Sequence, residues 1–299
     1  MPDPTTGPIV VEFTDNGEAG FPTRVDVRVR QGDLGRDGSV STIGMARWLE
    51  DARLRVRMRR FERLVGSGGF GPLRILLAGQ HVERLARADR SDGIVQVRSG
   101  VRRIGRSSFT IGHAVFAGDR HVGSGEATIV LAGPEGPRAL PDELIADLRD
   151  VQSAEPDQAT VARPGAERQQ RDHYAHFFPL HARIGDVDIN DHVNFISLAG
   201  WYDEAVSAFA LKATGTRDRG PVPDLSPWSY RIHYTGEVTY PGDYDIGILI
   251  RSLDGDSVHY EMGVFRDGTC LGVADAVGAR GELPAEWLEA SLVQPGTAP

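Results

Sequence analysis

Polar side chains that can act on a carbonyl group occupy alternate positions in a short stretch of the second half of the chain. They are Asp188, Asn190, His192 and Asn194. A carboxylate can attack a carbonyl carbon or activate water, an amide can orient water, and an imidazole can relay a proton near neutral pH. The helical pattern that follows supplies N–H groups that can hold an oxyanion. The stretch therefore predicts acid–base or nucleophilic catalysis.

The two halves of the chain have similar sequences. Segment 32–52 matches segment 185–205 without a gap, and the block from Gly93 to Ala127 matches the block from Gly242 to Ala276. A third match, Leu140 to Glu143 against Leu283 to Glu286, closes each half. Three blocks in the same order indicate a tandem duplication.

Only the second copy carries the candidate catalytic residues. In the first copy the four alternating positions hold Gly35, Asp37, Ser39 and Ser41. An offset of 149 residues also pairs Glu237 with Ala88, so the first copy lacks this acid too. The shared fold does not require polar residues that one copy lacks, and Glu237 therefore joins the candidate site.

Helix capping is the alternative explanation for these residues, because Asp and Asn are preferred immediately before a helix. Capping requires one such residue, whereas four are present. Asp186 has Asp33 as its counterpart in the first copy, and we interpret it as a turn or helix cap. For Asn194, stabilisation of the turn is an alternative to a role in the site.

The elements that must position the site follow one order in both copies. Apolar residues at helical spacing predict the longest helix of the first copy over 41–64 and its counterpart over 193–212. Alternating patterns and turn residues predict the strands. These are 25–30, 75–85, 94–104, 108–116 and 122–131, then 177–183, 228–234, 244–253, 257–265 and 269–277. The order predicts an α+β protein in which each antiparallel sheet wraps around a long central helix.

Composition limits the class of protein. The chain of 299 residues is 40% hydrophobic and 25% charged, as in compact globular proteins, and we expect domains at 20–150 and 173–292 joined by an exposed linker at 151–172. A net charge of −9 argues against nucleic-acid binding. Without a long apolar run or a secretion signal, we expect no membrane span and a cytoplasmic location.

Several smaller signals are interpreted structurally. The single cysteine, Cys270, is expected to have a packing role and no redox role. Three histidines at 173, 176 and 181 lack the cysteine or carboxylate pair that would complete a metal site, so no metal or other cofactor is expected. Arg53, Arg57 and Arg60 share a helix face that could meet a cofactor phosphate or an acidic carrier protein, but the neighbouring acids favour a solvated face.

The segment 185–194 resembles the Asp-x-Asn-x-His-Val-Asn signature of acyl-ACP thioesterases, which are double-hotdog enzymes. It is also similar to the Asp-x-Asp-x-x-Gly-His-Val-Asn-Asn pattern of hotdog thioesterases, including the 4-hydroxybenzoyl-CoA thioesterase group, whose second Asp is catalytic and matches Asp188. Segment 234–237 is similar to a Tyr-x-x-Glu on the next strand of the acyl-ACP enzymes. Asp191 replaces the glycine of the broader pattern and Phe195 its second asparagine. Val238 stands where plant enzymes often have cysteine, so no thiol nucleophile is expected.

The resemblance implies a tandem (double) hotdog fold that forms an internal pseudo-dimer, with a degenerate site in the first domain and the question of a further homodimer left open. It implies an enzyme of fatty acid metabolism that hydrolyses acyl-CoA or acyl-ACP. In such an enzyme Asp188 is the nucleophile or general base, Asn190 and His192 assist Asp188, and Glu237 is an auxiliary acid. Asn194 and Phe195 are the expected substrate-binding residues. The alternatives are a noncatalytic acyl-thioester-binding or regulatory hotdog protein and a hotdog hydratase or dehydratase.

Overall fold

The computed structural model describes residues 12–13, 20–56, 58–68, 74–154, 164–188, 191–215, 226–281 and 283–292. The chain forms two compact units. Unit 1 consists of Met1–Val40, Gly44–Ala78 and Arg84–Thr160, and unit 2 consists of Ser41–Ile43, Gly79–Glu83 and Val161–Pro299.

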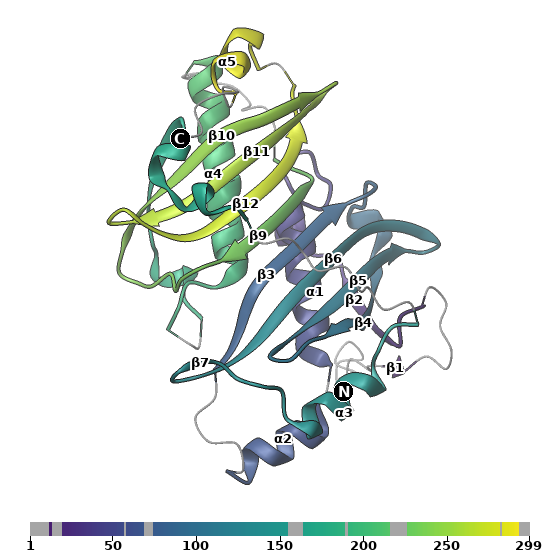
Figure 1. Ribbon diagram of the computed structural model, residues 1–299. Coiled ribbons are helices and arrows are strands. Elements are labelled where there is room, and N and C mark those ends of the chain that lie inside the picture. The colour runs from purple at the N-terminus through teal and green to yellow at the C-terminus, as the bar shows by residue number, and fades with distance from the viewer. Residues whose placement is uncertain are drawn as a thin grey trace. The chain divides into compact units, whose positions relative to one another are not determined.

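Unit 1 contains a strand, a long helix and then an antiparallel meander (Figure 1). Its strands are β1 (Glu12–Phe13), β2 (Thr23–Arg28), β3 (Arg74–Arg84), β4 (Ile94–Ile104), β5 (Ser108–Ala117), β6 (Arg120–Gly133) and β7 (Gly136–Pro137). Its helices are α1 (Thr42–Arg55), α2 (Arg59–Gly66) and α3 (Asp142–Asp150). The first two residues of α1 and Gly79–Glu83 of β3 are the parts of these elements that belong to unit 2. The strand order is β1-β2-β4-β5-β6-β3, with β7 on β6.

Unit 2 repeats this order of elements. Its strands are β8 (His176–His181), β9 (Ser229–Tyr234), β10 (Asp243–Asp254), β11 (Ser257–Arg266) and β12 (Thr269–Ala279). Its helices are α4 (Phe195–Thr214) and α5 (Ala285–Ala290). The strands run in the order β9-β12-β11-β10-β8, and each pairing is antiparallel. The predicted strands are confirmed in both units, with ends that differ by a few residues at most.

Irregularities in the sheets recur at equivalent places, as the duplication predicts. The β4–β5 ladder shifts register between Val101 and Arg103, and the β10–β11 ladder shifts between Ile250 and Ser252. The next ladder of each unit also shifts register, between Val115 and Phe116 in the β5–β6 ladder and between Val264 and Phe265 in the β11–β12 ladder. A bulge inserts an unpaired residue and bends its strand. Both sheets therefore bend at matching positions.

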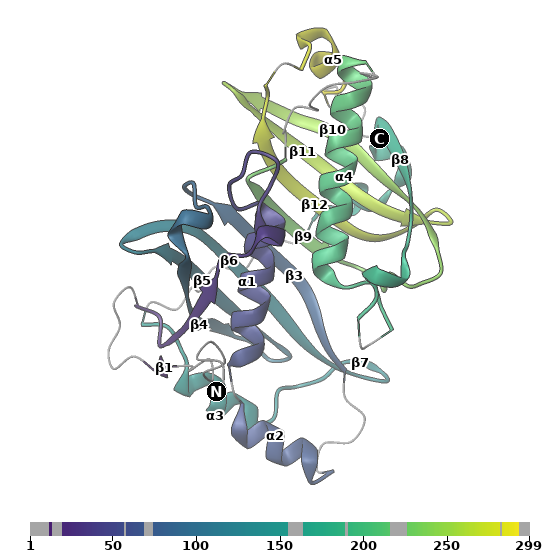
Figure 2. The same cartoon turned by 180° about the vertical axis from the view of Figure 1, so that it is seen from behind.

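Each sheet packs against its own long helix (Figure 2). In unit 2, α4 buries Trp201, Tyr202 and Phe209 completely or almost completely, and β10 presents Ile246 and Ile248 with no exposed surface. Side chains two residues apart on a strand share a face, which explains how β10 supplies a continuous apolar surface. Within the part of the chain that the structure describes, no helix combines the length and apolarity needed to cross a membrane.

The single helix predicted over 41–64 is wrong, because α1 ends at Arg55 and α2 begins at Arg59. Met58 precedes α2 in a non-helical conformation (φ −106°, ψ 68°). The carboxylate of Asp147 in α3 accepts hydrogen bonds from the backbone N–H groups of Arg60 and Phe61, at 2.8 and 3.0 Å. These groups would otherwise lack acceptors, so a residue far along the chain stabilises the second helix start.

The linker predicted at 151–172 is not uniformly exposed. Residues 155–163 lie outside the described part, but Val151, Ser153 and Arg168 are buried. Arg168 binds the carboxylate of Asp275 and the carbonyl of Ala274 on β12, the latter at 3.0 Å. The expectation of exposure is therefore wrong for these residues.

Beyond this segment, Tyr174 packs with Leu249 and Phe265, and Cys270 lies against the same cluster. Burial raises the pKa of the Cys270 thiol. Cys270 is half-buried, and the prediction that it has a packing role is confirmed.

Candidate active site

The turn that carries Asp188 and His192 is closed by backbone hydrogen bonds. The N–H of Asp188 donates to the carbonyl of His192 at 3.0 Å, and the N–H of Asp191 donates to the carbonyl of Asp188 at 3.1 Å. Val187 and Val193 form an antiparallel bridge at its base. Asn190, one of the predicted catalytic residues, lies outside the described residues together with Ile189.

Asp191 explains why the broader pattern has glycine at this position. Its φ is 61°, in the left-handed region, and its counterpart Gly38 in unit 1 has a φ of 76°. Glycine adopts this conformation without strain, and aspartate tolerates it better than most residues do. The replacement of glycine by Asp191 therefore preserves the turn.

Helix α4 begins directly after the turn. The side chain of Asn194 accepts a hydrogen bond from the N–H of Ile196 at 2.7 Å, and its own N–H donates to the carbonyl of Asp186 at 2.7 Å. Asn194 is thus the N-cap of α4, as the alternative interpretation proposed. Its predicted contact with substrate remains a prediction.

Asp186 has the structural role that the sequence suggests. Its carboxylate accepts a hydrogen bond from the N–H of Arg183 at 2.9 Å, and the carboxylate of Asp33 accepts one from Arg30 at the same distance. Both aspartates are 6% exposed. The interpretation of Asp186 as a cap within the turn is confirmed.

Glu237 and His192 meet although they are 45 residues apart in sequence. His192 Nε2 lies 3.0 Å from Glu237 Oε2, and the side chains are 33% and 44% exposed. The backbone brings them together, because the N–H of Val193 donates to the carbonyl of Val238 at 2.8 Å and His192 bridges to Thr239. The turn and the segment after β9 therefore form one site with an accessible acid–imidazole pair.

Phe195, at the first position of α4, contacts Tyr234 at the end of β9. Their ring centroids lie 4.9 Å apart, and both side chains are partly exposed. Sequence reasoning used Tyr234 as part of a motif and did not assign it to the site. The Tyr-x-x-Glu spacing, which places it three residues before Glu237, is the signal that identifies it.

The backbone of unit 1 reproduces this turn and corrects one sequence pairing. Gly35 donates to the carbonyl of Ser39 at 2.7 Å, and Val40 donates to that of Ala88 at 2.8 Å. The second bond is equivalent to the one from Val193 to Val238, so Ala88 corresponds to Val238. The pairing of Glu237 with Ala88 is therefore wrong, and Arg87 takes the place of Glu237. Unit 1 has one additional residue before Gly93, which explains the shifted offset.

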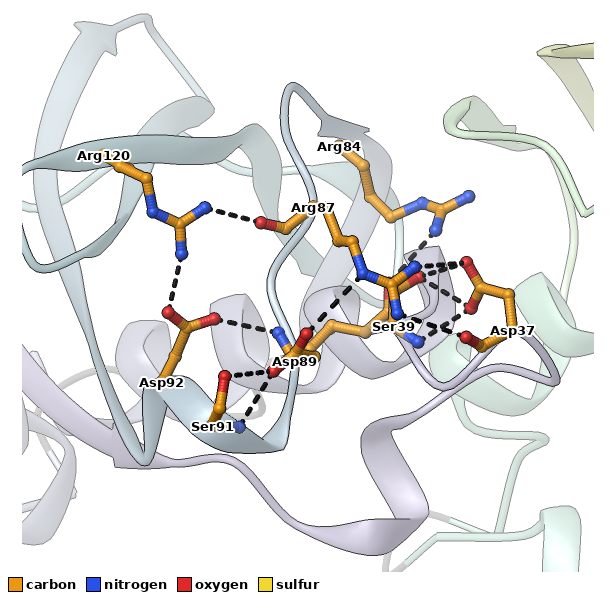
Figure 3. A network of polar contacts seen from close by, with 9 residues as sticks. Asp37, Ser39, Arg84, Arg87, Asp89, Ser91, Asp92 and Arg120 are labelled. Atoms are coloured by element: carbon orange, nitrogen blue, oxygen red, sulfur yellow. Dashed lines mark hydrogen bonds and ion pairs between the residues drawn. The ribbon is translucent and has the colours of Figure 1, made fainter.

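The equivalent place in unit 1 holds an ion-pair network instead of an acid–imidazole pair (Figure 3). Arg87 lies 3.3 Å from the carboxylate of Asp37 and 3.6 Å from that of Asp89. Ser39, the counterpart of His192, donates its hydroxyl to Asp37 at 2.7 Å. Burial raises the pKa of Asp37, but the hydrogen bonds from Ser39 and the charges of Arg87 and Arg84 outweigh it and lower the pKa overall.

The three clustered histidines have separate partners. His173 lies 2.8 Å from Glu261, His176 lies 2.9 Å from the Ser291 hydroxyl, and His181 pairs with Asp243. Among the residues that the structure describes, no group of three or more His, Cys, Asp or Glu side chains is placed to hold a metal ion.

No family model and no curated protein matches the sequence. Solved structures do match. A Lactobacillus plantarum protein whose structure bears the name oleoyl thioesterase has a TM-score of 0.65 at 14% identity, over 87% of this chain and 96% of its own. The 12:0-ACP thioesterase from Umbellularia californica has a TM-score of 0.62 at 16% identity, over 85% and 95%. An acyl-ACP thioesterase from Bacteroides thetaiotaomicron has a TM-score of 0.61 at 13% identity, over 85% and 96%. The chain therefore has the fold of these proteins over almost their whole length, and the expected resemblance is confirmed at the level of the fold.

Proposed function

We propose that this protein is an acyl thioesterase built from two hotdog units, and that unit 2 carries its active site. The observation that carries the proposal is the pairing of His192 with Glu237 beside the backbone of Asp188, at the N-terminus of α4. These side chains occur together in unit 2 alone, since unit 1 has Ser39, Arg87 and Gly35 in the equivalent positions. The shared fold with three thioesterases makes thioester hydrolysis the best-supported chemistry.

The carboxylate of Asp188 acts on the carbonyl carbon of the thioester in one of two ways. It removes a proton from the attacking water, or it attacks directly and forms an anhydride that water then hydrolyses. In both routes a carbon–oxygen bond forms, the carbon–sulfur bond breaks, and the oxygen of water ends in the free acid.

The oxyanion and the departing thiolate need their own partners. Apart from the N–H of Ile196, which donates to Asn194, the first turn of α4 supplies N–H donors at the positive end of the helix dipole, where the developing oxyanion is stabilised. His192, oriented by Glu237, delivers the proton to the thiolate, and Asn190 orients the water. Asn194 holds the helix start in place and, with Phe195, borders the acyl thioester.

The structural likeness to the three thioesterases also suggests the substrate class. We assign a fatty acyl thioester carried on an acyl carrier protein, because the three matching structures are named for oleoyl, 12:0-ACP and acyl-ACP substrates, and coenzyme A is the alternative carrier that the sequence motif implies. A noncatalytic acyl-binding protein would bind the same thioester without releasing thiol. A hydratase would interconvert enoyl and hydroxyacyl thioesters, also without releasing thiol.

Thiol release from acyl-ACP and acyl-CoA panels of increasing chain length tests the proposal. Asp188→Ala should reduce turnover at least about 100-fold, as loss of an acid–base or nucleophilic group does. Asp191→Asn is the matched control, because it removes a carboxylate from the same turn and retains a residue that tolerates the left-handed conformation. Equal turnover by Asp188→Ala and wild type, or binding without thiol release on both panels, would refute the assignment.

A further inference from the structure

The interior of unit 1 contains three polar side chains where unit 2 has apolar ones. Ser99 on β4 pairs directly opposite His113 on β5, and the equivalent pair in unit 2 is Ile248 opposite Met262. The aligned helices place Arg53 of α1 at the position of Val206 in α4. Ile248, Met262 and Val206 are fully buried. The shared fold is thus satisfied by three apolar residues, and the polar set in unit 1 requires a separate reason.

Ser99 and His113 form a buried hydrogen-bonded pair. Ser99 Oγ lies 2.7 Å from His113 Nδ1, and the residues are 1% and 3% exposed. The carbonyl of Ser99 accepts a further hydrogen bond from the hydroxyl of Thr23 at 2.8 Å. His113 Nε2 is buried and has no hydrogen-bond partner among the described residues. Buried polar atoms without partners are rare, because their lost hydration is not replaced.

Arg53 lies near enough to this pair for its positive charge to lower the pKa of His113. Its side chain is only 13% exposed, and Arg53 Nη2 lies 3.8 Å from Glu50 Oε1. The expectation of a solvated helix face is therefore wrong for Arg53. Burial, and then the charge of Arg53, lower the pKa of His113 to about 3, so the imidazole is neutral at pH 7. When the Ser99 hydroxyl donates to Nδ1, Nε2 carries the remaining proton and is a donor.

The surroundings of the pair are apolar. Val97 and Val101 flank Ser99 on its strand, Ile111 and Val115 flank His113, and none of the four is more than 2% exposed. Ala52, next to Arg53 on α1, is fully buried. The cluster therefore combines one neutral imidazole donor and one hydroxyl within an apolar interior with the guanidinium of the partly exposed Arg53.

We propose that Arg53, Ser99 and His113 form a binding site in unit 1 for the carboxylate of a small apolar carboxylic acid. The imidazole Nε2 donates to one carboxylate oxygen and the guanidinium of Arg53 pairs with the group. A single cation shared with Glu50 matches a monoanion better than a phosphate dianion. The site is independent of the hydrolysis proposed for unit 2, although a carboxylic acid is also the class of product that such hydrolysis releases.

Calorimetric titration with octanoate and benzoate tests this site, with octanamide and benzamide as uncharged controls. The wild type should bind the acids and not the amides. The variant Arg53→Val/Ser99→Ile/His113→Met, which carries the residues of unit 2 at all three positions, should lose at least about tenfold in affinity, as expected when charge-assisted hydrogen bonds are removed. Arg53→Met should show a similar loss of affinity. Because Arg53 is partly exposed and Met is also unbranched, this single variant is expected to fold, and it keeps the test usable if the triple variant does not fold.

Asp188→Ala separates this site from the one in unit 2. It should bind octanoate with the affinity of the wild type, whether or not it retains thiol release. Equal octanoate affinity in the wild type, Arg53→Met and the triple variant would overturn the proposal, as would failure of the wild type to bind either acid. Loss of octanoate binding in Asp188→Ala with retention in the triple variant would place the bound acid in unit 2 and would also overturn it.

Discussion

Acid should destabilise this protein partly through His113, and the size of the effect follows from its burial. In the folded protein the pKa of His113 is lowered from 6.5 to about 3, first by burial and then by the charge of Arg53. The unfolded chain therefore binds a proton between these pH values that the folded chain does not bind. The free energy of unfolding is unaffected above pH 6.5 and falls by about 1.4 kcal/mol for each pH unit below it.

Lowering the pH from 6.5 to 4.5 should thus cost about 2.3 kcal/mol through this residue, because the unfolded histidine is already half protonated at pH 6.5. Ser99→Ile/His113→Met removes the titrating group, and the cost of packing the larger side chain at position 99 is the same at both pH values. Between pH 6.5 and pH 4.5 the free energy of unfolding of the double variant should therefore fall less than that of the wild type, by an amount of that order. Urea unfolding at pH 6.5 and at pH 4.5, followed by tryptophan fluorescence, measures how much the free energy of unfolding changes in each protein. His121→Met, which removes an exposed histidine, is the control. Equal pH dependence of the wild type and the double variant would refute the reasoning.

Three further predictions concern stability and are measured by urea unfolding at pH 7. Arg168→Met should destabilise unit 2 by about 1–3 kcal/mol, because it removes the buried guanidinium that donates to Asp275 and Ala274, while Glu261 keeps Arg251 at 3.4 Å; a change below 1 kcal/mol would contradict this. Asp147→Ala should cost about 1–2 kcal/mol, because the N–H groups at the start of α2 lose their acceptor, and Asp150→Ala, at an exposed neighbour, should cost less. Asp191→Ala should cost about 1 kcal/mol through its left-handed backbone, whereas Asp191→Gly should be nearly neutral; equal stability of the two variants would argue against strain at this position.

The strands were predictable because their signals are local. β4 extends from Ile94 to Ile104, as predicted, since alternation of side chains and the adjoining turn residues lie within the segment itself. The start of α4 was predictable to within two residues for the same reason, because Asn194 is an N-cap encoded next to the helix. The break between α1 and α2 was not, because the carboxylate that stabilises the start of α2 comes from Asp147.

Some features of the candidate site were likewise predictable from local sequence, and others were not. Asp188, His192 and Asn194 share one turn, so their proximity was implied by their spacing. The hydrogen-bonding distance between His192 and Glu237 was not, because it depends on the backbone contact between Val193 and Val238. The counterpart of Glu237 was also assigned wrongly, since a one-residue difference in a turn shifts the sequence offset without changing the hydrogen bonds of the backbone.

The sequence by itself determined the duplication and the order of the elements, because each depends on patterns among neighbouring residues. Only the tertiary structure decided which distant groups meet. It paired His192 with Glu237, buried Arg168 against β12, and enclosed Ser99 and His113 within unit 1. Such contacts depend on strand register and on the packing of the sheet against its helix, and these are properties of the whole chain.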